Sequence, residues 1–124
     1  MGARQQNNEP IIALTSDGGL QFCLAELANG KNWALPIIYI VWNNQGYGEI
    51  ESYMLIVGIT PAGVGPKPPK IDALAKAYGI GYAYLTSFGE MTNVLQKAAK
   101  SQSPILLEIN EALIMAQIES IVPL

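Results

Sequence analysis

Two short polar stretches carry the side chains that could bind a metal ion and a phosphate. Each directly follows an apolar run: SDGG at 16–19 and NNQGYG at 43–48. Asp17 and Asn44 offer the hard oxygen ligands that Mg²⁺ favours, and a backbone carbonyl near Gly46 offers a third. We therefore expect a metal site to which both stretches contribute.

The glycines of the first stretch suit a phosphate. Gly18 and Gly19 let the backbone approach an anion closely, and a helix that follows would point its first N–H groups at that anion. Each stretch alone is typical of a turn. Their occurrence together, after two consecutive predicted strands and with residues 19–42 between Gly18 and Asn43, is much less expected by chance. Together they predict a cradle for a metal-bridged diphosphate.

The elements that must position these stretches follow from the apolar pattern. Continuous apolar runs predict strands at 11–14, 36–42, 80–85 and 104–109. Helical spacing predicts helices over 20–28, 49–54 and 71–78, with Gly30 ending the first and Gly79 the third. A further helix is expected from the Ser87–Glu90 capping box onward, and a loop at 60–69. This alternation predicts an α/β fold, a doubly wound and mostly parallel sheet flanked by helices, which binds ligands at the carboxyl ends of its strands.

The tail is expected to be a helix with Ile114, Ile118, Ile121 and Val122 on one face. That face either packs on the core of its own subunit or forms an interface, and the sequence leaves both open. We divide the chain into an irregular or disordered segment at 1–10, one domain at 11–110 and this tail at 111–124.

Composition excludes several classes of function. Of 124 residues, 50% are hydrophobic and 14% charged, and the net charge of −3 comes without a basic stripe, so we expect no nucleic-acid partner. The absence of histidine excludes Ser-His-Asp and Cys-His catalysis and His-based zinc sites within this chain. The single cysteine, Cys23, is expected to be a buried structural thiol. With no apolar run of about 20 residues and no signal-peptide core, we expect no membrane association and a cytoplasmic location.

The stretch SDGGLQFCLAELANGKNWALPIIYIVWNNQGYGEI resembles a known motif. The thiamine-diphosphate motif consists of Gly-Asp-Gly, then about two dozen residues, then Asn-Asn. The later elements of the same domain are similar to IDALAKAYGIGYAYLTSFGEM and PILLEI of this chain. Residues 10–110 thus resemble the diphosphate-binding C-terminal domain of the acetolactate synthase and 2-oxo acid decarboxylase superfamily. The resemblance implies the cofactors thiamine diphosphate and Mg²⁺ and a small-molecule 2-oxo acid substrate.

The resemblance also assigns site residues. It implies that Mg²⁺ is bound by the Asp17 carboxylate, the Asn44 side chain and the Gly46 carbonyl. It implies a diphosphate site at Ser16, Gly18, Gly19, Tyr47 and Gly48, where Ser16 stands in place of the family's first glycine and its hydroxyl could donate to a phosphate. Some relatives place active-site side chains where residues 49–51 lie, although exposed helix charges are the simpler interpretation of Glu49 and Glu51.

The family builds its active site between two domains, which sets an expectation about partners. The resemblance implies about fifty further residues before the first strand, and a pyrimidine-binding domain, usually of another subunit, that supplies a glutamate. Glu108 and Glu111 do not replace that glutamate. We therefore expect a chain that is inactive alone, as a fragment, a subunit or a relic, and that works as a homo-oligomer or with a separate domain. The alternative is a non-catalytic α/β interaction or structural module that oligomerises through exposed apolar faces.

Overall fold

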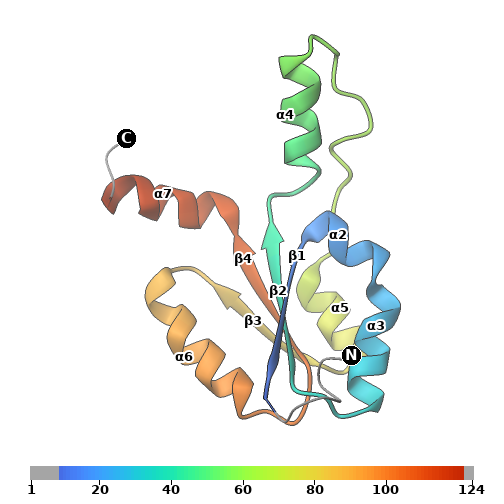
Figure 1. Cartoon of the computed structure of the whole chain (residues 1–124), viewed down its shortest axis with the longest axis vertical. Helices are drawn as coiled ribbons and strands as arrows, with labels where there is room; N and C mark the ends of the chain where they lie inside the picture. The colour runs from blue at the N-terminus through green and yellow to red at the C-terminus, as the bar shows by residue number, and fades with distance from the viewer. Residues whose placement is uncertain (1–8, 122–124) are drawn as a thin grey trace.

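A four-stranded parallel sheet forms the centre of the molecule (Figure 1). The computed structural model describes residues 9–121. The strands are β1 (Ile11–Ser16), β2 (Ile37–Asn43), β3 (Gly81–Leu85) and β4 (Ile105–Asn110), in the spatial order β1-β2-β4-β3. The doubly wound, parallel α/β fold predicted from the sequence is confirmed.

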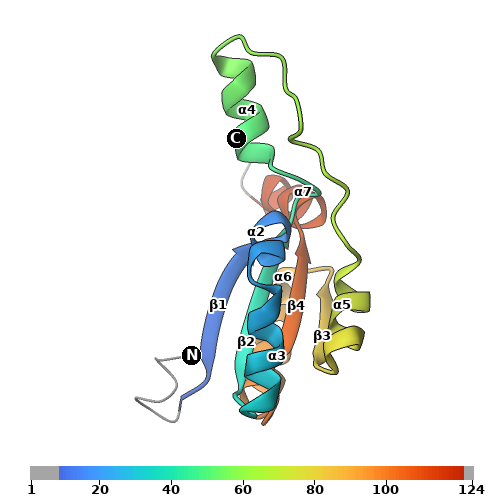
Figure 2. The same ribbon diagram turned by 90° about the vertical axis from the view of Figure 1, so that its right-hand side faces the viewer.

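Helices connect the strands and cover both faces of the sheet (Figure 2). They are α2 (Asp17–Phe22), α3 (Leu24–Asn32), α4 (Gly48–Ile56), α5 (Ile71–Tyr78), α6 (Phe88–Ala99) and α7 (Glu111–Ile121). The strand order determines their side. The chain moves in one direction from β1 to β2 to β3 and then returns to β4, so right-handed crossovers place α6 on the face opposite to α2, α3 and α5.

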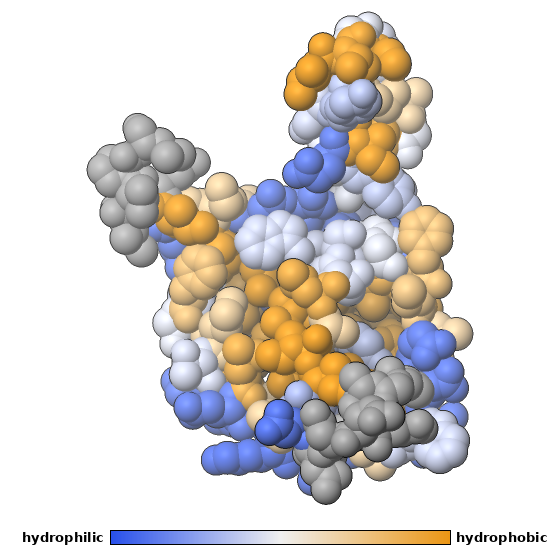
Figure 3. Space-filling view, viewed as in Figure 1, coloured by the Kyte–Doolittle hydropathy of each residue, from blue (hydrophilic) through white to orange (hydrophobic). Residues whose placement is uncertain are grey.

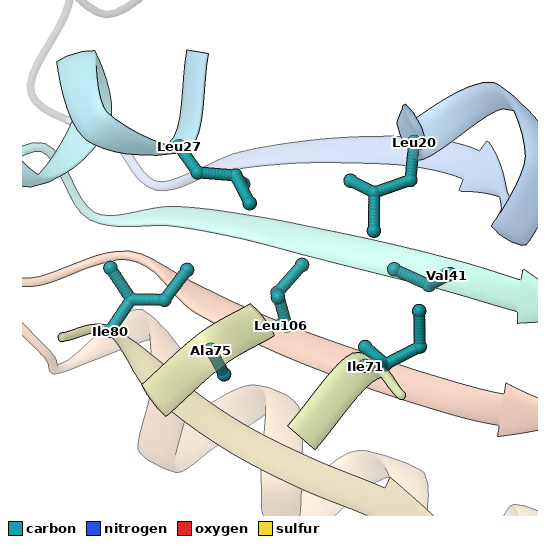
Figure 4. Close-up of a cluster of buried hydrophobic side chains, with 7 residues drawn as sticks. All are labelled: Leu20, Leu27, Val41, Ile71, Ala75, Ile80 and Leu106. Atoms are coloured by element: carbon teal, nitrogen blue, oxygen red, sulfur yellow. The ribbon is translucent and has the colours of Figure 1, made fainter. Parts of the chain in front are cut away.

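Two hydrophobic clusters lie on the two faces. The first joins α2, α3 and α5 to the sheet through seven buried residues: Leu20, Leu27, Val41, Ile71, Ala75, Ile80 and Leu106 (Figure 4). The second joins α6 and α7 to the other face and includes Leu107, Ile109 and Ile114. Successive residues of β4 belong to different clusters because strand side chains alternate between faces. Burial on both faces explains the continuous apolar runs of β2 and β4.

The first helical segment is not the single helix predicted over 20–28. The chain leaves helical geometry at Cys23 (φ −120°, ψ 16°), which separates α2 from α3. Nor does Gly30 end the helix, because α3 continues to Asn32. Gly30 lies where a Cβ would come within 3.1 Å of Pro104, so the glycine allows close packing of the helix. The turn comes after it, at Ala34, with φ 49°.

Cys23 is exposed, and the predicted buried thiol is wrong. Leu24 packs against the first cluster, whereas Cys23 lies at the break itself, where the backbone leaves helical geometry, and does not belong to that cluster. Leu20 and Leu27 stay buried on either side of the break.

The structure confirms the predicted end of the helix at Gly79 but not the predicted cap at the start of the helix that follows Ser87. Gly79 does stop α5, with φ 63° in the left-handed region and its N–H bonded back to the last turn. The capping box predicted at α6 does not form, since Ser87 makes no side-chain cap. The Glu90 carboxylate instead accepts from the N–H and hydroxyl of Thr86.

Helix α7 packs on the core of its own chain. It begins directly after β4, where the Asn110 side chain accepts from the N–H of Leu113. Ile114 is fully buried and Ile118 is packed against the same cluster. Both residues thus support the own-core interpretation of the tail, whereas Val122 lies outside the described residues. Across residues 9–121, no helix combines the length and apolar character needed to cross a bilayer.

Helix α4 extends away from the body of the molecule (Figures 1 and 2). None of its residues is buried. Figure 3 shows apolar residues on this projection, and the exposed large side chains between residues 50 and 59 are Ile50, Tyr53, Leu55, Ile56, Val57 and Ile59. Edge strand β1 also exposes Ile12 and Leu14. The chain therefore presents apolar surface that its own described elements do not cover.

Candidate functional site

The sheet register brings the two polar stretches together. Strands β1 and β2 are parallel neighbours, and Ser16 is paired with Trp42. The residues that follow both strands therefore emerge side by side at the carboxyl edge of the sheet, where doubly wound proteins bind ligands. The linkage predicted from strand order alone thus has a direct structural basis.

Three oxygen-bearing groups converge at this edge. One terminal atom of the Asn44 amide lies 2.9 Å from the Gly46 carbonyl oxygen and 3.1 Å from Oδ1 of Asp17. If this atom is nitrogen, it donates to both oxygens; if it is oxygen, it completes a cluster of three oxygens. Asp17 is fully buried, and its Oδ2 has no hydrogen-bond partner in the described chain. A buried carboxylate oxygen without a donor is a costly arrangement, which a cation would relieve.

An unusual turn after β2 places the second stretch. Gln45 is in the left-handed region at φ 63°, and its N–H donates to Oδ1 of Asn43 at 3.0 Å. Gly46 follows at φ 159°, and a Cβ there would lie 2.9 Å from the Val64 carbonyl oxygen. The N–H of Tyr47 donates to that same oxygen at 2.9 Å. The loop before α5 thus packs against the turn and bonds to it through the Val64 carbonyl. Because this carbonyl is so close, only glycine fits at position 46.

The first stretch forms the start of α2. Ser16 has a negative φ of −87°, so a residue with a side chain is accommodated without strain at this position. Its hydroxyl oxygen accepts from the N–H of Gly19 at 2.9 Å and caps the helix. Gly18 lies against the Tyr47 ring, where a Cβ would be 2.5 Å from a ring carbon. The two stretches are therefore in direct contact.

A hollow of about 200 Å³ opens over these residues. It is lined by Ser16, Asn44, Gly46, Tyr47, Gly48, Glu49 and Ile50. Five predicted site residues contribute to it, while Asp17 and Gly18 lie buried beside it. Glu49 and Glu51 are exposed in the first turn of α4, as expected for helix charges. Where the structure describes the chain, it contains no group of three His, Cys, Asp or Glu side chains that could hold a metal, so the oxygen cluster depends on an amide and a carbonyl.

Sequence reasoning did not identify a second set of residues that supports this edge. Glu108 of β4 is 8% exposed, and its two oxygens accept from the Asn43 amide and from the Tyr82 hydroxyl, each at 2.6 Å. Burial and the bond to Glu108 raise the pKa of Tyr82 well above its usual value, so the hydroxyl stays a donor. The available signal was the charged residue in the apolar run ILLEI, since a charge in a buried strand needs partners.

The fold and this edge first define a class. A parallel sheet with helices on both faces, and with glycines and polar groups at the ends of adjacent strands, is typical of a doubly wound α/β domain, a class that binds ligands at the carboxyl ends of its strands. The family model described as thiamine pyrophosphate enzyme, C-terminal TPP binding domain, matches residues 1–109. The chain belongs to this family, as the resemblance predicted.

Known proteins of the family include decarboxylases and acetolactate synthases. The chain is 30% identical over 113 residues to a Pseudomonas aeruginosa protein named "Probable 2-ketoarginine decarboxylase", covering 90% of this chain and 20% of that protein. It is 23% identical over 101 residues to acetolactate synthase of Bacillus subtilis, covering 82% of this chain and 18% of that protein. The chain thus spans about a fifth of the length of such relatives.

Solved structures agree on the fold. Benzoylformate decarboxylase from Polynucleobacter necessarius superposes with a TM-score of 0.78 at 21% identity, covering 87% of this chain and 20% of that chain. The thiamine diphosphate-dependent 4-hydroxybenzoylformate decarboxylase of Rhodococcus jostii gives a TM-score of 0.73 at 24% identity, covering 82% and 19%. At these identities the likeness concerns the fold.

Proposed function

We propose that this chain is the thiamine-diphosphate- and Mg²⁺-binding domain of a 2-oxo acid decarboxylase or an acetolactate-synthase-like carboligase. The observation that carries the proposal is the oxygen cluster at the ends of β1 and β2, with the unsatisfied carboxylate of Asp17 in it. Family membership supports thiamine diphosphate as the cofactor, and the geometry of the edge supports these residues as its site.

The distances in the cluster suit an octahedral Mg²⁺. Ligand oxygens at 2.0–2.1 Å from Mg²⁺ that occupy adjacent octahedral positions are about 3 Å apart. The Asn44 amide lies 2.9 Å from the Gly46 carbonyl and 3.1 Å from the Asp17 carboxylate, which matches this spacing. In this proposal Asp17, Asn44 and Gly46 are the protein ligands, with the Asn44 oxygen facing the ion.

The neighbouring hollow suits a diphosphate. We assign Ser16, Gly18, Gly19, Tyr47 and Gly48 to its walls. Because Ser16 already accepts from the Gly19 N–H, its hydroxyl hydrogen remains available to a phosphate oxygen. Mg²⁺ would offset the charge of exposed Glu49 at the rim. Thiamine diphosphate, when bound, would supply a nucleophilic thiazolium carbon for a 2-oxo acid and a thiazolium ring as the electron sink for loss of CO₂.

We also propose that this chain works with a partner domain or subunit. The chain spans a fifth of the length of its relatives, and the pyrimidine-binding half of the site belongs in this account to another segment or subunit. The exposed apolar residues of α4 and β1 are available for that contact and for a homo-oligomer. We assign the chain to the cytoplasm, because an exposed single thiol such as Cys23 persists in a reducing compartment.

A titration with Mn²⁺ in the presence of thiamine diphosphate tests the metal assignment. Asn44→Leu removes one proposed ligand and should abolish metal binding while the fold is retained. Asn93→Leu makes the same chemical change on an exposed position of α6 and should bind as the wild type does. Unchanged affinity in Asn44→Leu would refute the assignment.

A non-catalytic interaction module is the second candidate. The observation that favours it is α4, which has no buried residue and carries exposed Tyr53 and Ile56. Such a module would form oligomers that do not depend on thiamine diphosphate or Mg²⁺. An oligomer with no cofactor affinity would favour this candidate over the first.

A further inference from the structure

We propose that Glu108, buried within β4, is a positioning residue for the turn that follows β2. The turn contains the proposed ligands Asn44 and Gly46, so the consequence for metal binding rests on the proposed function. The positioning itself rests only on contacts within the chain.

Glu108 links three adjacent strands on one face of the sheet. Its Oε1 accepts from Nδ2 of Asn43 at the end of β2, and its Oε2 accepts from the hydroxyl of Tyr82 on β3. Both distances are 2.6 Å, as in charge-assisted hydrogen bonds. Both oxygens of this buried carboxylate therefore have donors.

The bond to Glu108 determines which way the Asn43 amide faces. An ionised carboxylate only accepts hydrogen bonds, so the NH₂ end of Asn43 must point to Glu108. The oxygen of Asn43 then faces the turn, where it accepts from the N–H of Gln45 at 3.0 Å. A reversed amide would set oxygen against carboxylate and NH₂ against N–H. Glu108 thus selects the acceptor that the turn requires.

This turn also determines the position of the oxygen cluster. Gln45 adopts φ 63°, which a residue with a Cβ rarely does without a stabilising bond. That conformation directs the Gly46 carbonyl to within 2.9 Å of the Asn44 amide, which itself lies beside Asp17. A loss of the bond from Glu108 to Asn43 should therefore loosen the turn without touching the cluster directly.

Conservative and apolar substitutions separate positioning from stability. Glu108→Leu removes both bonds but fills a buried site with an apolar side chain, which is often well tolerated by the fold. Glu108→Gln can still accept from Asn43 through its oxygen and donate to the Tyr82 hydroxyl oxygen through its nitrogen. Leu107→Val changes the opposite face of the same strand and is the matched control.

Amide hydrogen exchange at Gln45, measured by NMR on the full chain without metal, tests the positioning. Glu108→Leu should speed this exchange about fivefold to tenfold, as expected for the loss of one hydrogen bond. Glu108→Gln should restore it to near the wild-type rate, and Leu107→Val should leave it unchanged. If Glu108→Leu does not fold, Glu108→Met removes the same bond to Asn43 with a more adaptable apolar side chain, leaves the Asn43 acceptor in place and should give the same acceleration.

Wild-type exchange at Gln45 in the folded Glu108→Leu or Glu108→Met variant would overturn the inference, as would equal acceleration in Leu107→Val. A parallel titration with Mn²⁺ in the presence of thiamine diphosphate separates this inference from the proposed function. We expect affinity to fall about tenfold in Glu108→Leu if one hydrogen bond to the turn is lost, and to recover in Glu108→Gln. A wild-type chain that does not bind Mn²⁺ contradicts the proposed metal site, while the exchange result still decides the role of Glu108.

Discussion

The burial of the Asp17 carboxylate is the feature of the site that most needs a physical explanation. Its side chain is fully buried, and one of its oxygens has no donor in the described chain. Within a protein interior such a charge is costly unless it is paired or coordinates a metal ion. The one group of the described chain that faces this carboxylate is the Asn44 amide, 3.1 Å from Oδ1, which leaves Oδ2 unsatisfied and favours ligand binding as the reason for its presence.

Asp17→Asn should therefore stabilise the metal-free chain. The neutral amide costs less to bury than the uncompensated carboxylate, and we expect the free energy of unfolding to rise by about 1–3 kcal/mol. Urea unfolding in the presence of a chelator measures this. With Mg²⁺ and thiamine diphosphate added, the order of stability should reverse because only the wild type gains binding energy. A metal-free Asp17→Asn chain that is less stable than the wild type would contradict this account of the carboxylate.

At the residue scale, the meeting of the two polar stretches at one edge of the sheet was predictable, while their role as ligands stays a prediction. Asp17 and Asn44 could be proposed because acidic and amide oxygens after two parallel strands must share an edge of the sheet. The roles of Glu108 and Val64 could not, since they arise from neighbours across strands and from a loop whose path the sequence does not determine.

At the scale of elements, helix ends set by backbone geometry behave as local chemistry predicts. Gly79 ends α5 in the left-handed region, a conformation that glycine adopts without strain. The break at Cys23 and the passage of α3 through Gly30 were not predictable in this way. The passage through Gly30 depends on close packing of the helix against Pro104 and β2, which local spacing does not contain, and nothing in the structure explains the break at Cys23.

Gly79→Ala should lower the free energy of unfolding by about 1 kcal/mol, the cost of a left-handed conformation for a residue with a Cβ. No atom lies within 4 Å of a Cβ built at this position, so the cost is conformational and not steric. Gly65→Ala is the control, because that glycine has equal space and no positive φ in the left-handed range. Equal stability of the two variants in urea unfolding would show that the αL cap contributes nothing.

The whole molecule has a core on both faces of its sheet and one helix that touches neither. The alternation of elements sufficed to predict a parallel, doubly wound sheet. The projection of α4 could not be predicted, because an apolar pattern indicates that a surface is to be covered but not what covers it. In the proposed assembly the covering surface is another domain or subunit.

Ile56→Glu should lower the average mass measured by light scattering. Ile56 is 81% exposed, so a charge there disturbs an intermolecular contact and leaves the fold of the chain unaffected. Thr92→Glu adds the same charge to an exposed position of α6 and should leave the mass unchanged. An Ile56→Glu chain with the wild-type mass would mean that α4 is not part of an interface in solution.

The central claim is that the edge formed by β1 and β2 binds thiamine diphosphate through Mg²⁺. Calorimetric titration of the chain with thiamine diphosphate, with and without Mg²⁺, tests it most directly. The account predicts binding with a dissociation constant on the order of micromolar, observed only when Mg²⁺ is present and lost in Asp17→Ala. The absence of binding to the wild-type chain, or binding that does not depend on Mg²⁺ and Asp17, would contradict it.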